Sequence, residues 1–214
     1  MKKELTQAQL GRIPSYLQVL MDFKNKGLEF VSSNDLADAL DLNFEMVRKD
    51  IAAISSKEGI PNKGRNVVEL IDDIEKVCGH DQNHNALLVG IGSLGRALLN
   101  YNRFEHYGLN IVAAFDNKDT HVGEKINGVP VYHFDDLKDV KRLYNASIGI
   151  ICVQKEKAQG VAIHLVASGI EAIWNFAPIK LDLNDDVIVS NMDMAESLAK
   201  LAHRLYRKVT KKGE

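Results

Sequence analysis

Three glycines with the spacing Gly-x-Gly-x-x-Gly follow a short apolar run near the middle of the chain, at Gly90, Gly92 and Gly95. Between a strand and a helix, the first glycine of such a loop permits a sharp turn. The second lets a pyrophosphate approach the backbone, and the third lets helix and strand pack closely. The first amides of the helix then face the phosphates. We therefore predict a dinucleotide site whose loop residues are Gly90, Ile91, Gly92, Ser93, Leu94 and Gly95.

An acidic residue ends the next apolar run, at Asp116 in NIVAAFDN, 21 positions after Gly95. A carboxylate at this place accepts hydrogen bonds from the ribose hydroxyls of an adenosine and repels a 2′-phosphate, which favours NAD(H) over NADP(H). We expect Asn117 and Val153 to line the same site. Two other interpretations stay open: glycines that serve packing alone, and a different nucleotide such as FAD, S-adenosylmethionine or coenzyme A.

No group suited to hydride-transfer chemistry follows the later strand-like runs. A dehydrogenase needs a proton donor or acceptor near the reacting carbon, for example a His with an acidic partner or a Tyr–Lys pair. The segments CVQKEK and WNFAP contain no such pair, and His133 with Asp135 is interpreted as a surface cap. We predict no catalytic residue. An apolar surrounding favours the uncharged, reduced nicotinamide, and its predicted contacts are Asn175, Phe176, Ala177 and Pro178.

The cysteines and histidines predict neither a metal site nor a disulfide. Cys78, His80 and His84 match no common zinc signature and supply only three ligands. Cys78 and Cys152 stand in a connector and an apolar run, so both are expected to be reduced thiols in the cytoplasm. No role is assigned to the isolated histidines His106, His121, His164 and His203.

The overall composition is that of a globular protein with a local basic segment. The chain has 214 residues and 45% hydrophobic content, and none of its apolar runs approaches the about 18 residues that would span a bilayer. A net charge of −2 argues against indiscriminate nucleic-acid binding. Residues 48–65, however, hold five basic and two acidic side chains, so they form a patch of charge +3.

The C-terminal part alternates short apolar runs with helical patterns, which predicts a parallel sheet of βαβ units. The expected strands lie in ALLVG, NIVAAFD, ASIGIICV, EAIWNF and DVIVS. Polar residues around CGHDQNHN mark a boundary. The final helical pattern carries an apolar stripe of Met194, Leu198, Leu201, Ala202 and Leu205, which would pack on its own domain or on a second subunit.

The N-terminal part is helical in its periodicity and predicts a helix-turn-helix followed by a wing. Pro14 suits the first turn of a helix that Gly27 ends, while Ser33 and Asn43 are the predicted N-caps of two further helices. In the last of these, Phe44, Val47, Ile51 and Ile54 form one apolar face. The segment SSKEGIPNKGRNVVEL then alternates turn residues with a β-prone stretch, as expected for a wing.

Basic side chains on these elements are the predicted contacts with double-stranded DNA. Arg48 and Lys49 lie early in the expected recognition helix and point away from its apolar face. Lys57, Lys63 and Arg65 flank the wing, which is placed along a minor groove. The alternative is a solvated basic face. The complete set of predicted DNA contacts is Arg12, Ser33, Arg48, Lys49, Lys57, Lys63 and Arg65.

Taken in order, RIPSYL, SSNDLADAL, VRKD, VGIGSLGRAL, AFD, WNFAP and VSNMD resemble the Rex family of redox-sensing transcriptional repressors over nearly the whole chain. The resemblance implies an α/β protein: a winged helix-turn-helix domain at 1–79, a Rossmann NAD(H)-binding domain at 80–190 and a domain-swapped helix at 191–214. It further implies a homodimer on a palindromic operator, with NADH and NAD⁺ competing for one site. Tyr101 and Asp193 would pair across the dimer as its switch.

The chain also departs from the usual family pattern at three places. Gln18 stands where the family commonly has Arg, Gly59–Arg65 reads GIPNKGR in the wing, and residues 51–54 read IAAI. These departures leave the operator and the preferred redox form open. Two other functions remain as alternatives, namely a small NAD-dependent dehydrogenase and a winged-helix regulator that senses another nucleotide.

Overall fold

The computed structural model describes residues 5–79, 84–101, 104–117, 121–192 and 194–210. They divide into two compact units, Met1–Gln82 and Asn83–Glu214, and each is described by itself. The predicted boundary lay between residues 79 and 80. Among the described residues, no helix combines the length and the apolar composition needed to cross a membrane.

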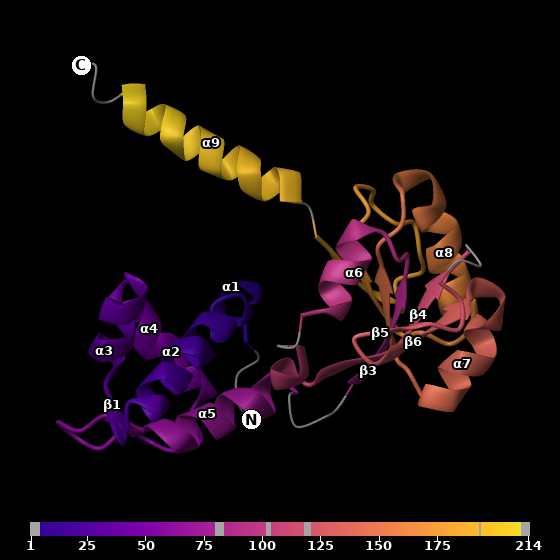
Figure 1. Ribbon diagram of the computed structural model, residues 1–214. Coiled ribbons are helices and arrows are strands. Elements are labelled where there is room, and N and C mark those ends of the chain that lie inside the picture. Colours follow the sequence, from indigo (N-terminus) through magenta and orange to yellow (C-terminus); the bar gives the residue numbers. More distant parts are fainter. Residues whose placement is uncertain (1–4, 80–83, 102–103, 118–120, 193, 211–214) are drawn as a thin grey trace. The chain divides into compact units, whose positions relative to one another are not determined.

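The N-terminal unit consists of helices with one small strand pair (Figure 1). Strands β1 and β2 pair antiparallel, with Val31 opposite Arg65. The elements are α1 (Gln7–Leu10), α2 (Ile13–Asn25), β1 (Phe30–Val31), α3 (Ser33–Leu40), α4 (Phe44–Ile54), β2 (Arg65–Asn66) and α5 (Val67–Val77).

Apolar periodicity and capping account for α4, as expected. Asn43 precedes the helix and its side chain accepts a hydrogen bond from the amide of Met46 at 3.2 Å. Val47, Ile51 and Ile54 are fully buried, because their spacing places them on one face. Phe44 lies on the same face at the start of the helix but is 39% exposed.

The cap of α3 differs from the prediction by one residue. Ser32, rather than Ser33, is the N-cap: its hydroxyl accepts from the amide of Asp35, and the Asp35 carboxylate accepts from the amide of Ser32. The two reciprocal bonds form a capping box, which satisfies two helix-end amides. Two serines in sequence left the cap ambiguous, and Asp35 selects the first because it lies three residues later.

The wing is a short hairpin, and the β-prone residues at its end begin a helix. Ile60 and Gly64 form a β-bridge, and Gly64 has a φ of 85°. A Cβ at Gly64 would meet the carbonyl oxygen of Val31 at 2.1 Å, so glycine is required there. The run NVV is not a longer strand, because Asn66 caps α5 by accepting from the amides of Val68 and Glu69.

The C-terminal unit is a seven-stranded sheet with the order β5-β6-β4-β3-β7-β8-β9, in which all neighbours pair parallel except β5 and β6. Its strands are β3 (His84–Val89), β4 (Leu109–Asp116), β5 (Lys125–Ile126), β6 (Val129–His133), β7 (Ile148–Ile151), β8 (Ala172–Asn175) and β9 (Ile188–Asn191). Five match the expected runs. The sequence interpretation missed β5 and β6, because the run that forms β6 is broken by Pro130 and was taken for a turn.

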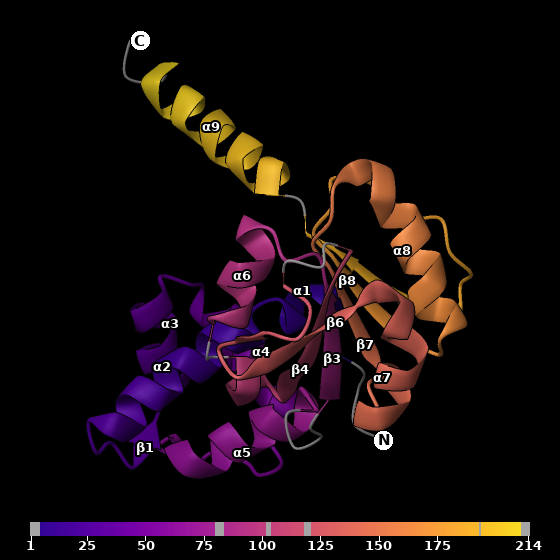
Figure 2. The same ribbon diagram turned by 45° about the vertical axis from the view of Figure 1, so that its right-hand side comes forward.

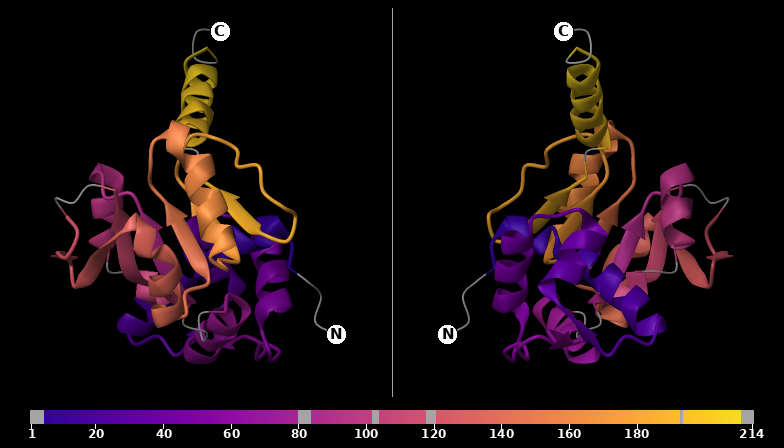
Figure 3. Two further views of the ribbon diagram at one scale, coloured as in Figure 1. Left: turned by 90° about the vertical axis from the view of Figure 1, so that its right-hand side faces the viewer. Right: turned by 90° about the vertical axis from the view of Figure 1, so that its left-hand side faces the viewer.

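Helices cover both faces of this sheet (Figure 2). Leu87, Val89 and Phe115 face α7 and α8, whereas Ala86 and Leu88 face α6. The left view of Figure 3 looks onto the face that α7 and α8 cover. The helices are α6 (Ser93–Leu99), α7 (Leu137–Tyr144), α8 (Lys155–Ala167) and α9 (Met194–Thr210), with short 3-10 turns at Phe104–Tyr107 and Phe134–Asp136.

Candidate nucleotide site and DNA-facing helix

A cavity of about 360 Å³ opens where β3, β4 and β7 end. Strand β3 lies between β4 and β7, so the chain crosses to opposite sides of β3 at this edge of the sheet. Such a switch point is where parallel α/β sheets bind nucleotides. The structure brings six predicted residues to this one cavity: Gly90, Ile91, Gly92, Asp116, Asn117 and Val153.

Two of the three glycines have the structural roles expected of them, and the role of Gly92 in pyrophosphate binding stays a prediction. Gly90 has a φ of 103°, and a Cβ on it would meet the carbonyl oxygen of Cys152 at 2.6 Å. A Cβ on Gly95 would meet the carbonyl oxygen of Gly90 at 2.0 Å, so strand and helix pack at backbone distance. A Cβ on Gly92 would meet nothing within 4 Å. The first two glycines are therefore required by the fold, while Gly92 leaves free space in front of the backbone.

The start of α6 faces this free space without a side-chain cap. Gly92 is the N-cap residue and supplies no side chain, so none bonds to the first amides of the helix. Ser93 is exposed, Leu94 is half-buried and both belong to the first turn. A bound pyrophosphate would satisfy these amides.

His121 belongs to the cavity although the sequence interpretation gave it no role. The Nη2 atom of Arg96 lies 2.8 Å from its Nε2 and 3.3 Å from its Nδ1. The guanidinium is therefore within hydrogen-bond distance of the imidazole. Glu124 Oε2 is 3.4 Å from Nδ1. His121 follows a strand-ending acid by five positions, which was a usable but weak signal.

The predicted nicotinamide segment lines a second cavity, of about 340 Å³, with Ala177, Pro178 and Met192 among its walls. Phe176 packs on Trp174, with ring centroids 4.7 Å apart. The side chain of Asn175 is engaged within its own loop, since Nδ2 donates to Ile179 O and Asn191 Oδ1, both at 2.9 Å. Asn175 therefore shapes the loop.

The two predicted switch residues are only partly described. Tyr101 is 46% exposed, and its ring centroid is 4.8 Å from that of Phe104. Asp193 lies outside the described residues. The helix that follows, α9, leaves its apolar side chains exposed: Leu198, Leu201 and Leu205 are between 61% and 65% accessible. Of the two expectations, packing of the stripe on its own domain is therefore not seen for these three described leucines.

Two reactive side chains, Cys152 and His133, are buried or used structurally. Burial raises the pKa of Cys152 to about 12, so its thiol stays protonated and is a poor nucleophile. His133 Nδ1 accepts from the amide of Asp135 at 3.3 Å, which confirms the predicted surface cap. Within the described residues, no three His, Cys, Asp or Glu side chains converge as a metal site. His80 of the weak zinc candidate is outside them.

Helix α4 presents basic side chains to solvent, as the DNA-binding prediction requires. Arg48 and Lys49 are exposed, and Arg48 donates to Glu45 at 2.8 Å. In the wing, Lys63 Nζ lies 4.7 Å from the ring centroid of Phe30. Lys57 forms an ion pair with Glu69. Ser33 is half-buried and belongs to the first turn of α3.

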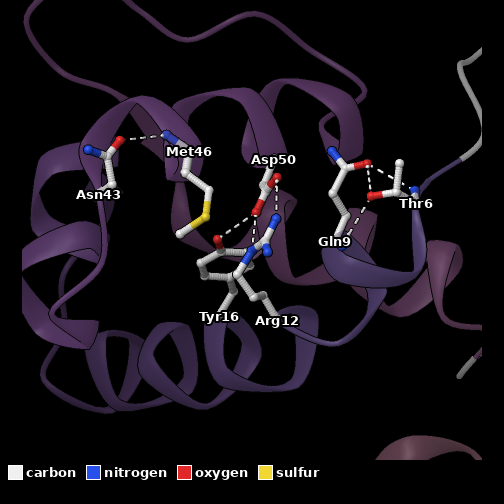
Figure 4. Close-up of polar contacts among 7 residues, drawn as sticks. All are labelled: Thr6, Gln9, Arg12, Tyr16, Asn43, Met46 and Asp50. Atoms are coloured by element: carbon white, nitrogen blue, oxygen red, sulfur yellow. Dashed lines mark hydrogen bonds and ion pairs between the residues drawn. The ribbon is translucent and has the colours of Figure 1, made fainter. Parts of the chain in front are cut away.

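Arg12 has an internal role that the sequence did not predict. Its Nε and Nη2 donate to the two oxygens of Asp50 at 2.7 and 3.1 Å, and Tyr16 Oη donates to Asp50 at 2.8 Å (Figure 4). These bonds join the start of α2 to α4. The guanidinium is still 24% exposed, and its predicted contact with DNA stays a prediction.

Comparison with known proteins agrees with this division into a DNA-binding and a nucleotide-binding unit. Residues 4–52 match the family described as putative DNA-binding protein N-terminus, and residues 81–179 match the CoA binding domain family. A redox-sensing transcriptional repressor Rex from Bacteroides thetaiotaomicron is 36% identical over 202 residues, which cover 94% of this chain and 91% of that protein. The chain belongs to the Rex family.

Alignments with other members of the Rex family also cover nearly the whole chain. Rex from Clostridium beijerinckii is 36% identical over 203 residues, which cover 95% of this chain and 96% of that protein. A crystal structure of RSP, a Rex-family repressor, in complex with β-NAD⁺ and operator DNA matches with a TM-score of 0.88 at 33% identity, covering 99% of this chain and 97% of RSP. RSP in complex with β-NADH matches with a TM-score of 0.85 over the whole of both chains.

Proposed function

We propose that this Rex family member is an operator-binding repressor whose affinity for DNA is set by the NADH/NAD⁺ ratio. The observation that carries the proposal is the match of the whole chain to RSP, which has been crystallised with NADH and with NAD⁺ on operator DNA. The cavity at Gly90, Gly92 and Asp116 supports it, because it offers the space and the carboxylate that an NAD(H) adenosine half requires.

Each predicted contact has a defined task in this proposal. Gly92, Ser93 and Leu94 hold the pyrophosphate on backbone amides, Asp116 holds the ribose, and Ala177 with Pro178 bounds the nicotinamide. Arg48 and Lys49 contact DNA in the major groove, while Lys57, Lys63 and Arg65 flank the wing, which lies along the adjacent minor groove. The protein functions as a homodimer, with the exposed apolar face of α9 covered by its partner. Tyr101 and Asp193 are the proposed switch residues.

The cofactor acts through the difference in its binding free energy between two arrangements of the dimer. A shift from 1:99 to 99:1 between them needs about 5.5 kcal/mol of differential cofactor binding, and two sites per dimer share that amount. Rigid-body rotation of the subunits is the proposed route, since it changes the spacing of the two α4 helices on DNA. The protein binds its operator DNA and is located in the cytoplasm.

A titration on a palindromic DNA library with NADH, NAD⁺ or neither cofactor tests the function. We expect NADH and NAD⁺ to give different retained fractions in a gel. The double variant Arg48→Ala/Lys49→Ala should lose retention and keep its affinity for NADH. The matched control is Lys24→Ala/Lys26→Ala, which removes two exposed charges at the end of α2 and its C-cap and should retain DNA. Retention by the first variant would show that α4 is misassigned.

We also propose that the nucleotide is a signal and is not consumed. Steady-state oxidation of NADH with a panel of carbonyl compounds should stay at the rate of the uncatalysed reaction. Turnover with any of them would favour the dehydrogenase alternative. Thermal-shift measurements with NADH and coenzyme A test the other alternative, a winged-helix regulator that senses another nucleotide. Of these two ligands, we expect only NADH to stabilise the protein.

A further inference from the structure

A cavity of about 320 Å³ lies at the base of the wing, entirely within the N-terminal unit and apart from the nucleotide site. Its walls come from four parts of the fold. Ser55 follows α4, Gly64 and Arg65 belong to the wing, and Phe30 and Leu70 close it from β1 and α5. The volume is at the lower end of the range for small-molecule pockets, so it suits a compact ligand.

Arg65 brings a buried N–H without a partner to this cavity. Its Nε atom is buried and has no hydrogen-bond partner, and within the described residues Arg65 takes part in none of the ion pairs. A guanidinium N–H that is removed from water without an acceptor is costly, and arginine cannot avoid the cost by losing its proton. Gly59 makes room for the group, since a Cβ there would meet Arg65 Nη1 at 3.3 Å.

A second polar atom in the same cavity lacks a partner. The Oγ atom of Ser55 is buried and unbonded. A hydroxyl and a guanidinium N–H can both donate to the same carboxylate. Arg65 and Ser55 therefore share one chemical need, which an acceptor with a negative charge would meet.

The carboxylates that also line the cavity do not meet this need. Glu69 forms an ion pair with Lys57. Asp73 Oδ2 accepts from the amide and the hydroxyl of Ser56, at 2.7 and 2.8 Å. Glu58 is exposed. Their charges nevertheless disfavour a doubly charged phosphate, so a singly charged acid fits the site better.

We propose that this wing-base cavity binds a small organic acid. Its carboxylate accepts from Arg65 Nε and Ser55 Oγ, and its apolar body lies against Phe30, Ile60 and Leu70. A planar carboxylate matches the fork of a guanidinium, which gives the site its preference.

Titration of the full-length protein with benzoate, followed by NMR at the arginine Nε–H signals, tests the proposal. Arg65→Gln assigns the Arg65 signal by its loss. We expect that signal to shift with saturation on addition of benzoate, and we expect contacts between the benzoate ring and the methyl groups of Leu70. Benzamide has the same shape without the charge and should leave the signal in place.

Two variants and one control localise the binding. Ser55→Ala should weaken benzoate about tenfold, because a hydrogen bond to a charged group is lost. Arg65→Gln should abolish the contacts with Leu70, with circular dichroism confirming that the domain is folded. Arg142→Gln is the matched control: Arg142 is an exposed residue of α7, and benzoate binding should be unchanged.

Four results would overturn the proposal. Absence of a shift would mean that the cavity holds water only, and equal shifts by benzamide would remove the role of the charge. A stronger response to inorganic phosphate would make this a phosphate site. A shift of the Arg65 signal by operator DNA but not by benzoate would make Arg65 a DNA contact.

Discussion

Arg12 and Asp50 form a two-point ion pair that links the residue before α2 to α4, the predicted recognition helix. Asp50 is only 2% exposed, and Tyr16 adds a third hydrogen bond to it. Burial by itself would raise the pKa of Asp50, but the bonds from Arg12 and Tyr16 outweigh it and place the pKa below its ordinary value. The carboxylate is thus charged, buried and fully partnered, while Arg48 and Lys49 lie on the same helix.

Removing one partner of this pair should destabilise the N-terminal unit. We expect Arg12→Ala to lower the free energy of unfolding by about 3 kcal/mol, because it leaves a buried carboxylate without its cation. Arg142→Ala breaks an exposed pair with Asp139 and should cost less than about 0.5 kcal/mol. Urea unfolding of both variants measures the difference. Equal effects would contradict a structural role for Arg12.

The same cluster predicts losses of stability in acid and in alkali. Because the folded pKa of Asp50 is lowered, its contribution is present above the unfolded value of about 3.9 and is lost as pH falls through the folded value. Burial and the bond to Asp50 raise the pKa of Tyr16 to about 12. Its contribution is present below about pH 10 and is lost as pH rises through about 12.

The variant Tyr16→Phe separates the alkaline contribution from the acid one. We expect the free energy of unfolding of the wild type to fall more steeply than that of the variant between pH 10 and 12. Below pH 4, both should still weaken because Asp50 is retained. Parallel curves in alkali would show that Tyr16 is not the group that titrates.

Two glycine substitutions should separate fold from binding. Gly92→Ala places a Cβ in open space, so the melting temperature should hardly change while NADH affinity drops at least tenfold. Gly95→Ala clashes with the backbone of Gly90 and should destabilise the whole unit. Gly160→Ala in α8 also meets open space and is the control with normal NADH binding. Energy transfer from Trp174, the one tryptophan of the chain, follows the binding.

His121 should contribute to the affinity for the adenosine half. Loss of its ring in His121→Ala removes a stacking surface worth about 0.5–1.5 kcal/mol, which is roughly a two- to tenfold loss of affinity. Calorimetry with NADH and with ADP-ribose should give the same factor, because the nicotinamide is not involved. His164→Ala on α8 is the control, as His164 bonds to Gly160 O. A loss confined to NADH would place His121 elsewhere.

The exposed stripe on α9 predicts the oligomeric state. Leu201→Asp should convert a dimer to monomers in light scattering, because it puts a charge into the covered face. His203→Asp introduces the same charge about 200° around the helix and should leave the dimer intact. Leu201 is already 63% exposed in the single chain, so the stability of the monomer should not explain the result.

Local signals were sufficient for α4 and for the glycine loop, but not for α5, whose first residues were expected to be β-prone. Gly90 to Gly95, Asp116 and the apolar face of α4 were predictable, because turn geometry and helical periodicity act over a few residues. The strand β6 was missed, since a proline and a following 3-10 turn hid its apolar run. The predicted cap was Ser33, whereas two reciprocal bonds with Asp35 make Ser32 the cap.

The sequence by itself determined that this protein has a helical DNA-binding part, a dinucleotide loop and an acid at the ribose end. Only the tertiary structure decided that Arg12 pairs with Asp50, that His121 meets Arg96 and that the Nε of Arg65 is buried at the base of the wing. The physical reason is distance along the chain. The first two partners are 38 and 25 residues apart, so no local pattern encodes the contact. Burial then determines how much free energy each charge costs when it lacks a partner.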